Sequence, residues 1–380
     1  CERTMNTLTR RNLIGYLANR NVLPKYGFPV DTVELRTAHC DSQVGSRLEL
    51  SRDLAAAIYE YAPGSEVVAG GVLWRSGGVY RLPDRELLSR CYTVCRTCQH
   101  YREGDETLEP ACPACGQTGD GPLREYYVPE FGFVAAHRTG KPAGSPPKSS
   151  WNGATHVVSL GDELAEQCWR SPGGATAWCR SGSRGRLVAI SEGPAGSGFL
   201  ICDWCGWGEP NLGKTAKSHV NPVRQRECTG PLRWRSLAHS YETDIVELRF
   251  DTPGLTDAAE WRSALYALLE GAADGLEISR DDIDGALHPG TDGRTGVVVF
   301  DTVPGGAGSA LRIAAALDVV VGAALRRVAS CDCGTETSCY GCLRTRRNER
   351  HHDQLSRGAA LRALRALTTT GPLVTDDRPY

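Results

Sequence analysis

Apolar and polar positions follow two periods along the chain, one of about 3.6 residues that is typical of helices and one of two residues that is typical of strands. Near the N-terminus, Leu13, Ile14 and Leu17 share one helical face, and Pro24 follows them. Ser51 is placed to cap a second helix, because a serine side chain accepts a backbone N–H of the first turn. The predicted elements of this part are a helix over 6–20, a strand over 30–35, a helix over 51–61 and a hairpin over 67–74.

After residue 240 the pattern changes to strands that alternate with long helices. The predicted elements are strands over 244–250, 276–278 and 297–300, and helices over 257–273, 308–328 and 353–367. This alternation predicts a small α/β unit. Together with the shorter strands before it, it gives the whole chain an expected α+β fold.

Composition is that of a globular protein. The 380 residues are enough for two or three domains, and 41% hydrophobic and 23% charged residues are ordinary fractions. The formal net charge of −2 excludes a polycation, so any contact with nucleic acid must come from a local patch. The apolar runs are too short to cross a membrane, and no membrane partner is expected. The first residue is Cys1, which suggests one piece of a longer polypeptide.

Sixteen cysteines are many for this length. Ten of them form five close pairs, which are Cys95/Cys98, Cys112/Cys115, Cys202/Cys205, Cys331/Cys333 and Cys339/Cys342. Repeated Cys-x-x-Cys in a large chain favours metal sites over disulfides, and therefore a reducing cytoplasm. Cys1, Cys40, Cys168 and Cys179 have no clear partner and are expected to be buried as small apolar residues.

The first cysteine group consists of Cys95, Cys98, Cys112 and Cys115. Two Cys-x-x-Cys pairs separated by thirteen residues predict a zinc ribbon, in which each pair supplies two thiolates. Cys91 lies nearby and is the spare. The alternative is a set of buried thiols without a metal.

The second group has one intact pair, Cys202 and Cys205. His219 and Cys228 are expected to complete it, since sites with three cysteines and one histidine are stable. The alternative is a histidine and a cysteine unrelated to the pair.

The third group places Cys331, Cys333, Cys339 and Cys342 within twelve residues. Thiolates this close together require a cation, and four sulfurs suit tetrahedral zinc. A basic run follows, and its predicted DNA contacts are Arg344, Arg346, Arg347, Asn348 and Arg350. The alternative is an ordinary solvated helix face.

All three sites have four protein ligands and leave no position for water. Up to three zinc ions per chain are therefore expected to stabilise the fold, each by about 10 kcal/mol or more, without taking part in catalysis.

The expected domains follow these groups. Residues 139–150 contain three prolines and two glycines and are expected to form a linker. The other regions are an N-terminal α+β region over 1–90, a zinc ribbon over 91–138, a β-rich region with the second zinc site over 151–240, and the α/β unit with the four-cysteine knuckle and a C-terminal helix over 241–380.

Two patterns suggest an enzyme instead. Residues 208–215, from Gly208 to Thr215, match the phosphate-loop pattern with Lys214 as the phosphate ligand, but no strand and helix of the required kind are expected around them. Asp244 and Asp301 lie near strand ends and could bind a metal in a nuclease, or they could cap turns. The glycines of 304–308 could also offer N–H groups to a DNA phosphate.

The third group and the residues around it resemble a known family. The segment 300–308, the spacing Cys-x-Cys-x5-Cys-x2-Cys of 331–342 and Asn348 look like the MrfA zinc-binding domain family. Further segments that resemble proteins with this domain are 23–31, 61–65, 129–133 and 241–244. The family implies zinc on the third group and a role in DNA handling beside a superfamily 2 helicase motor, including in antiphage systems such as DISARM.

The sequence lacks a phosphate loop in the proper context, an Asp-Glu-x-His box and the arginine pair of a helicase motor. The leading hypothesis is a zinc-stabilised module, not catalytic by itself, that binds DNA or docks on a helicase motor in antiphage defence or DNA repair. The alternatives are a nuclease using Asp244 and Asp301 and an NTPase using the 208–215 loop.

Overall fold

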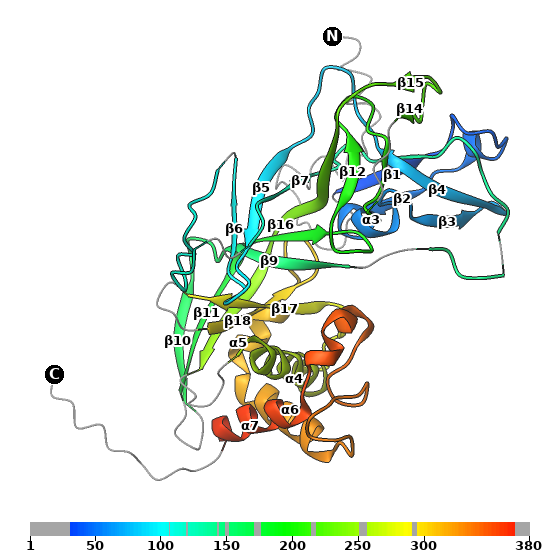
Figure 1. The fold of residues 1–380 in the computed structure, drawn as a ribbon. Helices are drawn as coiled ribbons and strands as arrows, with labels where there is room; N and C mark the ends of the chain where they lie inside the picture. Colours follow the sequence, from blue (N-terminus) through cyan, green and yellow to red (C-terminus); the bar gives the residue numbers. More distant parts are fainter. Residues whose placement is uncertain are drawn as a thin grey trace.

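The computed structural model of the protein describes residues 31–368, apart from 106, 119–120, 143, 149–151, 171–175, 214–217, 251–256 and 291–294. The helix predicted over 6–20 and Cys1 lie outside the described residues. Two large sheets, a small two-stranded sheet and a layer of helices make up most of the described part (Figure 1).

A five-stranded sheet forms the N-terminal part. Its order is β2 (Ser51–Asp53), β1 (Thr32–Arg36), β8 (Phe133–Ala135), β4 (Val72–Val79) and β3 (Glu66–Ala69). The predicted hairpin is confirmed, since β3 and β4 pair antiparallel. A single 3-10 turn, η1 (Gly45–Arg47), lies between β1 and β2.

Helix α3 (Leu54–Glu60) packs beside this sheet. The predicted cap was wrong: Ser51 belongs to β2, and the Asp53 side chain accepts the Ala56 N–H at 2.9 Å. Aspartate caps a helix as well as serine does. Ser51 and Arg52 are not available as caps because they pair with strand β1.

An eleven-stranded sheet forms the middle of the molecule. Its main path is β10 (Ala165–Arg170), β11 (Thr176–Ser191), β16 (Leu232–Phe250), β7 (Arg124–Tyr127), β5 (Ser89–Val94) and β6 (Tyr101–Gly104). The branches are β9 (Gly153–Ser159) on β11, β12 (Phe199–Cys202) and β18 (Thr295–Asp301) on β16, β13 (Gly208–Pro210) on β12, and β17 (Ile283–Pro289) on β18. Strands β14 (His219–Val220) and β15 (Glu227–Cys228) pair separately. The sheet thus runs through the expected regions 91–138, 151–240 and 241–380.

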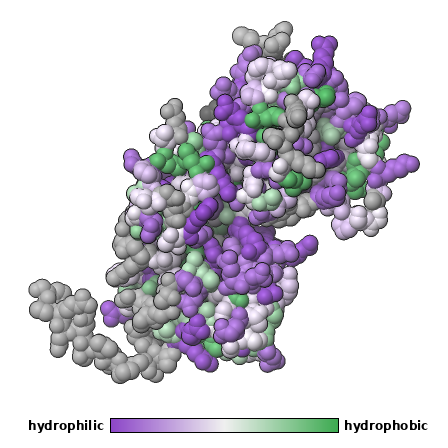
Figure 2. Space-filling view, in the orientation of Figure 1, coloured by the Kyte–Doolittle hydropathy of each residue, from purple (hydrophilic) through white to green (hydrophobic). Residues whose placement is uncertain are grey.

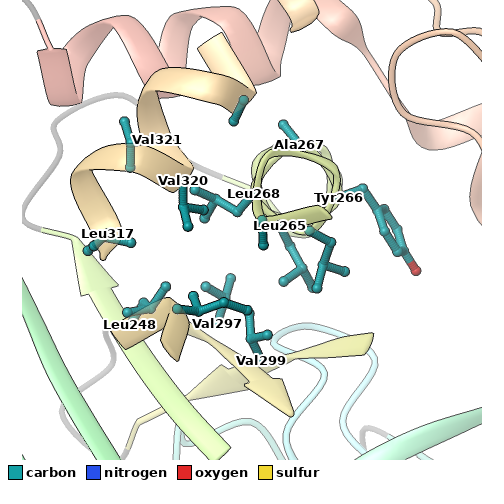
Figure 3. Close-up of a cluster of buried hydrophobic side chains, with 14 of the residues drawn as sticks. Leu248, Leu265, Tyr266, Ala267, Leu268, Val297, Val299, Leu317, Val320 and Val321 are labelled. Carbon is teal, nitrogen blue, oxygen red and sulfur yellow. The ribbon is translucent and has the colours of Figure 1, made fainter. Parts of the chain in front are cut away.

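The helices of the C-terminal part cover one side of this sheet. They are α4 (Ala258–Leu276), α5 (Ser309–Ala315), α6 (Leu317–Ser330) and α7 (Arg357–Thr368), with the 3-10 segment η2 (Arg346–Gln354) before α7. Leu265 and Leu268 of α4 point toward Val320 of α6 and toward Leu248 and Val297 of the sheet (Figure 3). This cluster is the largest apolar core of the described residues and holds the helices on the sheet.

Three predictions for this part need correction. The prediction of a strand over 276–278 was wrong, because helix α4 continues to Leu276 and Glu277 after it has a left-handed φ of 52°. The helix over 308–328 is two helices, α5 and α6, that meet at Ala316. The helix over 353–367 begins later, at Arg357. The sheet beneath is antiparallel, with β18 between β16 and β17.

Hydrophilic side chains gather around a hollow on the face shown in Figure 2, between the part that contains β1–β4 and the helical part.

The cysteines without a predicted partner differ in burial. Cys179 is buried as expected and Cys40 is partly buried, whereas Cys168 is exposed on β10.

Candidate metal centres and the arginine segment

The structure brings together the four cysteines of the first group. The Sγ atoms of Cys95 and Cys115 lie 3.5 Å apart, and those of Cys98 and Cys112 lie 3.6 Å apart. A zinc ion with Zn–S bonds of about 2.3 Å holds its sulfurs about 3.8 Å apart, whereas a disulfide joins them at about 2.05 Å. The spacing fits a tetrahedral zinc site. Cys91 stays outside the group, with its Sγ 3.8 Å from Glu125.

Each Cys-x-x-Cys pair of the first two groups is held in the same turn. The first cysteine donates its backbone N–H to the carbonyl of the fifth residue after it; these bonds are Cys95 to His100 at 2.9 Å, Cys112 to Gln117 at 2.8 Å and Cys202 to Trp207 at 2.8 Å. The residue after each second cysteine has a positive φ, of 67° in Gln99, 75° in Gly116 and 73° in Gly206. Each of these three two-sulfur knuckles is therefore shaped by a hydrogen bond and a backbone angle within six consecutive residues.

The second group is completed from two strands. His219 of β14 lies directly opposite Cys228 of β15, and the Sγ atoms of Cys202 and Cys228 are 3.8 Å apart. The ligand atoms of the four residues all lie within 4.8 Å of one another, as in the other two groups.

The imidazole of His219 fits a metal ligand. It is buried and stacks on Trp207, with the ring centroids 5.1 Å apart. Its Nε2 is buried without a hydrogen-bond partner among the described residues. Such an atom is costly to bury, and a zinc ion would satisfy its lone pair.

The third group is the most compact. The Sγ atom of Cys331 lies 3.5 Å from those of Cys333 and Cys339, and the Sγ atom of Cys342 lies 3.6 Å from Cys333 and 3.8 Å from Cys339. Cys342 and the adjoining Leu343 are buried in the core beneath the helices. A metal here would join the end of α6 to the segment that leads into α7.

All three groups offer four protein ligands, and each group can hold a zinc ion. The first and third groups supply four cysteines each, and the second supplies three cysteines and one histidine. Such sets suit zinc with no position left for water, so a zinc ion bound to any of them would stabilise structure.

The arginine segment, residues 344–350 after the third group, contains arginines with different roles. Arg344 packs on the knuckle: its Nε donates to Ser338 Oγ at 3.0 Å. Arg347 lies 3.4 Å from a carboxylate oxygen of Asp281. Arg346 and Arg350 are exposed, and no carboxylate of the described residues lies within ion-pair distance of either. In α7, the partly buried Arg357 donates to the Val328 carbonyl, and the exposed Arg362 pairs with Glu260.

Asn348 holds this segment in shape. It is buried, its Oδ1 accepts the Thr345 N–H at 2.8 Å, and its Nδ2 donates to the Leu343 carbonyl at 2.8 Å. These bonds cap η2 at its first turn. Asn348 fixes the arginines from below and is not part of the exposed surface.

The two aspartates considered for a nuclease are occupied by backbone groups. Asp301 is fully buried and accepts the N–H groups of Ala307, Ser309 and Ala310 at 2.5, 3.1 and 2.7 Å. Asp244 accepts the Gly308 N–H at 2.8 Å. Burial raises the pKa of Asp301, although these N–H bonds oppose the effect. The nuclease interpretation is not supported. The glycine N–H groups expected for a DNA phosphate already have acceptors within the fold: Gly308 donates to Asp244, whereas Gly305 and Gly306 donate to the backbone carbonyls of Glu242 and Val303.

The phosphate-loop match is not supported either. Gly208 to Pro210 form β13, which pairs antiparallel with β12 and closes the second knuckle. A phosphate loop needs its first glycine at the end of a buried strand that leads into a helix. Lys214 and Thr215 lie outside the described residues.

Sequence reasoning missed the side chains that join the first knuckle to the helices. Arg262 of α4 donates to Gln99 Oε1 and to Gln354 Oε1, both at 3.0 Å. These residues are far apart in the chain, so a pattern of neighbouring residues could not pair them. The structure itself marks Gln99 by a positive φ of 67°, which a glutamine rarely adopts.

The third group and the helices around it lie in a part of the chain that is similar to a known class of zinc-binding domain. Residues 264–343 match the family model of the MrfA Zn-binding domain, which confirms the resemblance on the segment 300–308 and the four cysteines.

Over 93% of its length the chain is similar to the Druantia protein DruE of Escherichia coli (strain UMEA 4076-1), at 24% identity. The chain spans 22% of the length of that relative.

Solved structures with some likeness are two crystal structures of the DUF1998 helicase MrfA. One is bound to DNA (TM-score 0.40, 12% identity, 93% of this chain and 39% of that chain), and the other to DNA and AMPPNP (TM-score 0.31, 10% identity, 83% and 29%). Among the described residues, no helix combines the length and apolar character needed to cross a membrane.

Proposed function

We propose that the protein is a zinc-stabilised module, without catalysis of its own, that binds DNA through the arginines after the third cysteine group. The observation that carries the proposal is the exposure of Arg346 and Arg350 on a segment held rigidly by Asn348 and the knuckle. Arginines without carboxylate partners remain available to phosphate oxygens, which they bind in a bidentate manner.

Rigidity supports this function. A flexible arginine gives up rotamer and backbone freedom when it binds, and pre-ordering the backbone removes part of that loss. The segment is fixed at one end by Cys342 and Leu343 in the core and at the other by α7, whose Leu364 and Leu367 are buried. Zinc on Cys331, Cys333, Cys339 and Cys342 would maintain this frame.

The other two groups serve the same purpose elsewhere in the fold. We assign zinc to Cys95, Cys98, Cys112 and Cys115, and to Cys202, Cys205, His219 and Cys228, which gives three ions per chain. Cysteines used in this way indicate a reducing compartment, and we place the protein in the cytoplasm.

The comparisons support a wider role for this module. Residues 264–343 match the MrfA Zn-binding domain, and the chain matches one part of a much longer relative. Both findings favour a module that acts beside a helicase motor, either in the same chain or as a docked subunit. Antiphage defence or DNA repair is the setting we propose for it.

The experiment is a binding titration of the whole chain with fluorescein-labelled DNA, single-stranded and duplex, at several salt concentrations. Arg346→Gln/Arg350→Gln should weaken binding to at least one of the two forms about tenfold or more, and reduce the salt dependence. The matched control is Arg138→Gln/Arg184→Gln, which removes the same charge from exposed positions far along the chain. Equal binding by both double variants would reject the proposed surface.

A further inference from the structure

A polar cavity lies between three parts of the chain that the sequence keeps far apart. It has a volume of about 380 Å³. The first knuckle contributes Arg96 and Gln99, helix α4 contributes Arg262, and η2 contributes Arg347 and Arg350. The cavity therefore begins at the arginine segment and ends at the first cysteine group.

The lining is positively charged. Five arginines face two carboxylates, Glu192 and Asp284, which leaves three positive charges. Arg124 is already paired with Glu192. The excess therefore comes from Arg96, Arg262, Arg347 and Arg350, of which only Arg347 has a carboxylate of the described residues within 4 Å.

Arg262 is the strongest sign of an anionic ligand. Its guanidinium donates to two neutral amide oxygens, those of Gln99 and Gln354, so its charge is hydrogen-bonded without being neutralised. Burial lowers the pKa of Arg262, and the nearby Arg350 acts in the same direction. Burying a cation in this way costs free energy that an anion in the cavity would recover.

The histidines of the lining add no charge at neutral pH. Burial, helped by Arg350, lowers the pKa of His351 and of His156 to about 3. Neutral His351 accepts a hydrogen bond from Arg350 Nε at 3.0 Å, which leaves the terminal nitrogens of that guanidinium for a ligand. The cavity thus combines fixed arginine charge with neutral polar groups.

Size and continuity select the ligand. A volume of about 380 Å³ is at the small end of the roughly 300–1,000 Å³ of ligand pockets, too small for a duplex. Arg347 and Arg350 belong both to the lining and to the proposed DNA surface. A single strand that contacts the arginine segment could continue into the cavity and reach the first knuckle.

We infer that the cavity between the first knuckle, α4 and η2 binds the phosphodiester backbone of a single DNA strand, with Arg96 and Arg262 as its far contacts. The inference rests on the proposed function and extends it. The first cysteine group would then position Arg96 for binding, in addition to stabilising the fold.

Arg96→Gln in the full chain tests this inference. Arg96 is exposed and ligates no metal, so the variant should fold with unchanged zinc content. Affinity for a labelled single-stranded fifteen-residue oligothymidylate should fall about fivefold to tenfold, with a salt slope lower by about 0.7 for one lost phosphate contact. Affinity for a blunt duplex should change less than about twofold.

Arg262→Gln and the control Arg184→Gln complete the test. Arg262→Gln should weaken single-strand binding at least as much as Arg96→Gln, whereas Arg184→Gln, whose position does not line the cavity, should bind as the unaltered protein does. If Arg96→Gln binds normally while Arg346→Gln/Arg350→Gln is impaired, the cavity inference is overturned and the proposed function stands. If the unaltered protein binds no DNA, both are overturned.

Discussion

Val79 donates its backbone N–H to the carbonyl of Gly206 at 2.9 Å, which attaches the second metal centre to strand β4 of the five-stranded sheet. The approach is close: a Cβ atom on Gly206 would lie 2.0 Å from the Val79 carbonyl oxygen. Gly78 and Trp207 also form an isolated bridge there. The second knuckle therefore joins the two sheets, and a metal bound there would support a contact between distant parts of the chain.

Gly206→Ala should destabilise the protein far more than Gly116→Ala. Both glycines follow a knuckle and have nearly the same positive φ, but nothing lies within 4 Å of a Cβ on Gly116. Gly116→Ala should cost only the backbone strain, about 1 kcal/mol, whereas Gly206→Ala adds a backbone clash and should cost about 3 kcal/mol or more. Urea unfolding measures both, and equal losses would contradict the close contact.

Zinc analysis should return close to three ions per chain, and His219→Ala should reduce this to about two. The variant removes the fourth ligand of the second group, and three cysteines alone hold zinc less tightly. His219→Cys restores four ligands and should keep the third ion. His156→Ala is the control, since His156 lies outside the three groups. Three ions in His219→Ala would remove His219 from the site.

Glu247 should make the free energy of unfolding decrease at acidic pH. Its carboxylate is almost fully buried; burial alone would raise its pKa, but bonds from His288, Arg249 and Arg180 lower the pKa to about 2 from 4.5. A lowered folded pKa gives stability that is complete above pH 4.5 and is lost as the pH falls toward 2. A shift of this size corresponds to roughly 3 kcal/mol.

Glu247→Gln tests that contribution. Its loss of unfolding free energy relative to the unaltered protein should be largest at about pH 6–7 and should shrink as the pH falls from 4.5 toward 2, because protonation removes the same charge. Exposed Glu163→Gln should follow the unaltered protein throughout. A deficit in Glu247→Gln that stays constant with pH would show that the carboxylate charge is not responsible.

Asp301→Asn should destabilise the fold by about 2–4 kcal/mol, because the carboxylate accepts three N–H groups at the start of α5. An amide replaces one acceptor oxygen with a donor that faces these groups. Chemical unfolding measures the loss, and exposed Asp282→Asn should be nearly neutral. Full stability in Asp301→Asn would reopen a catalytic role for this residue.

Most of the metal ligands could be predicted from the sequence because they lie close together along the chain. A Cys-x-x-Cys pair forms its knuckle within six residues, through a bond such as that from Cys95 to His100. The spacing therefore identified the ligands that the structure brings together, and the compact third group identified the MrfA Zn-binding domain. Hairpin β3–β4 and helix α4 were also predicted, since their patterns depend on neighbouring residues.

Tertiary structure decided what those local units do together. The sequence left open whether the Asp301 carboxylate binds a metal or accepts backbone N–H groups. The fold decides this, because the N–H groups of Ala307 and Ala310, six and nine residues later, donate to that carboxylate. The sequence predicted Asn348 as a DNA contact, whereas in the fold its side chain is buried and caps η2 by accepting the Thr345 N–H. The cavity depends on Arg96 and Arg262, which the chain separates by more than 160 positions, and periodicity carries no information about such a distance. The sequence determined three sets of metal ligands, and packing determined which arginines remain available for a ligand.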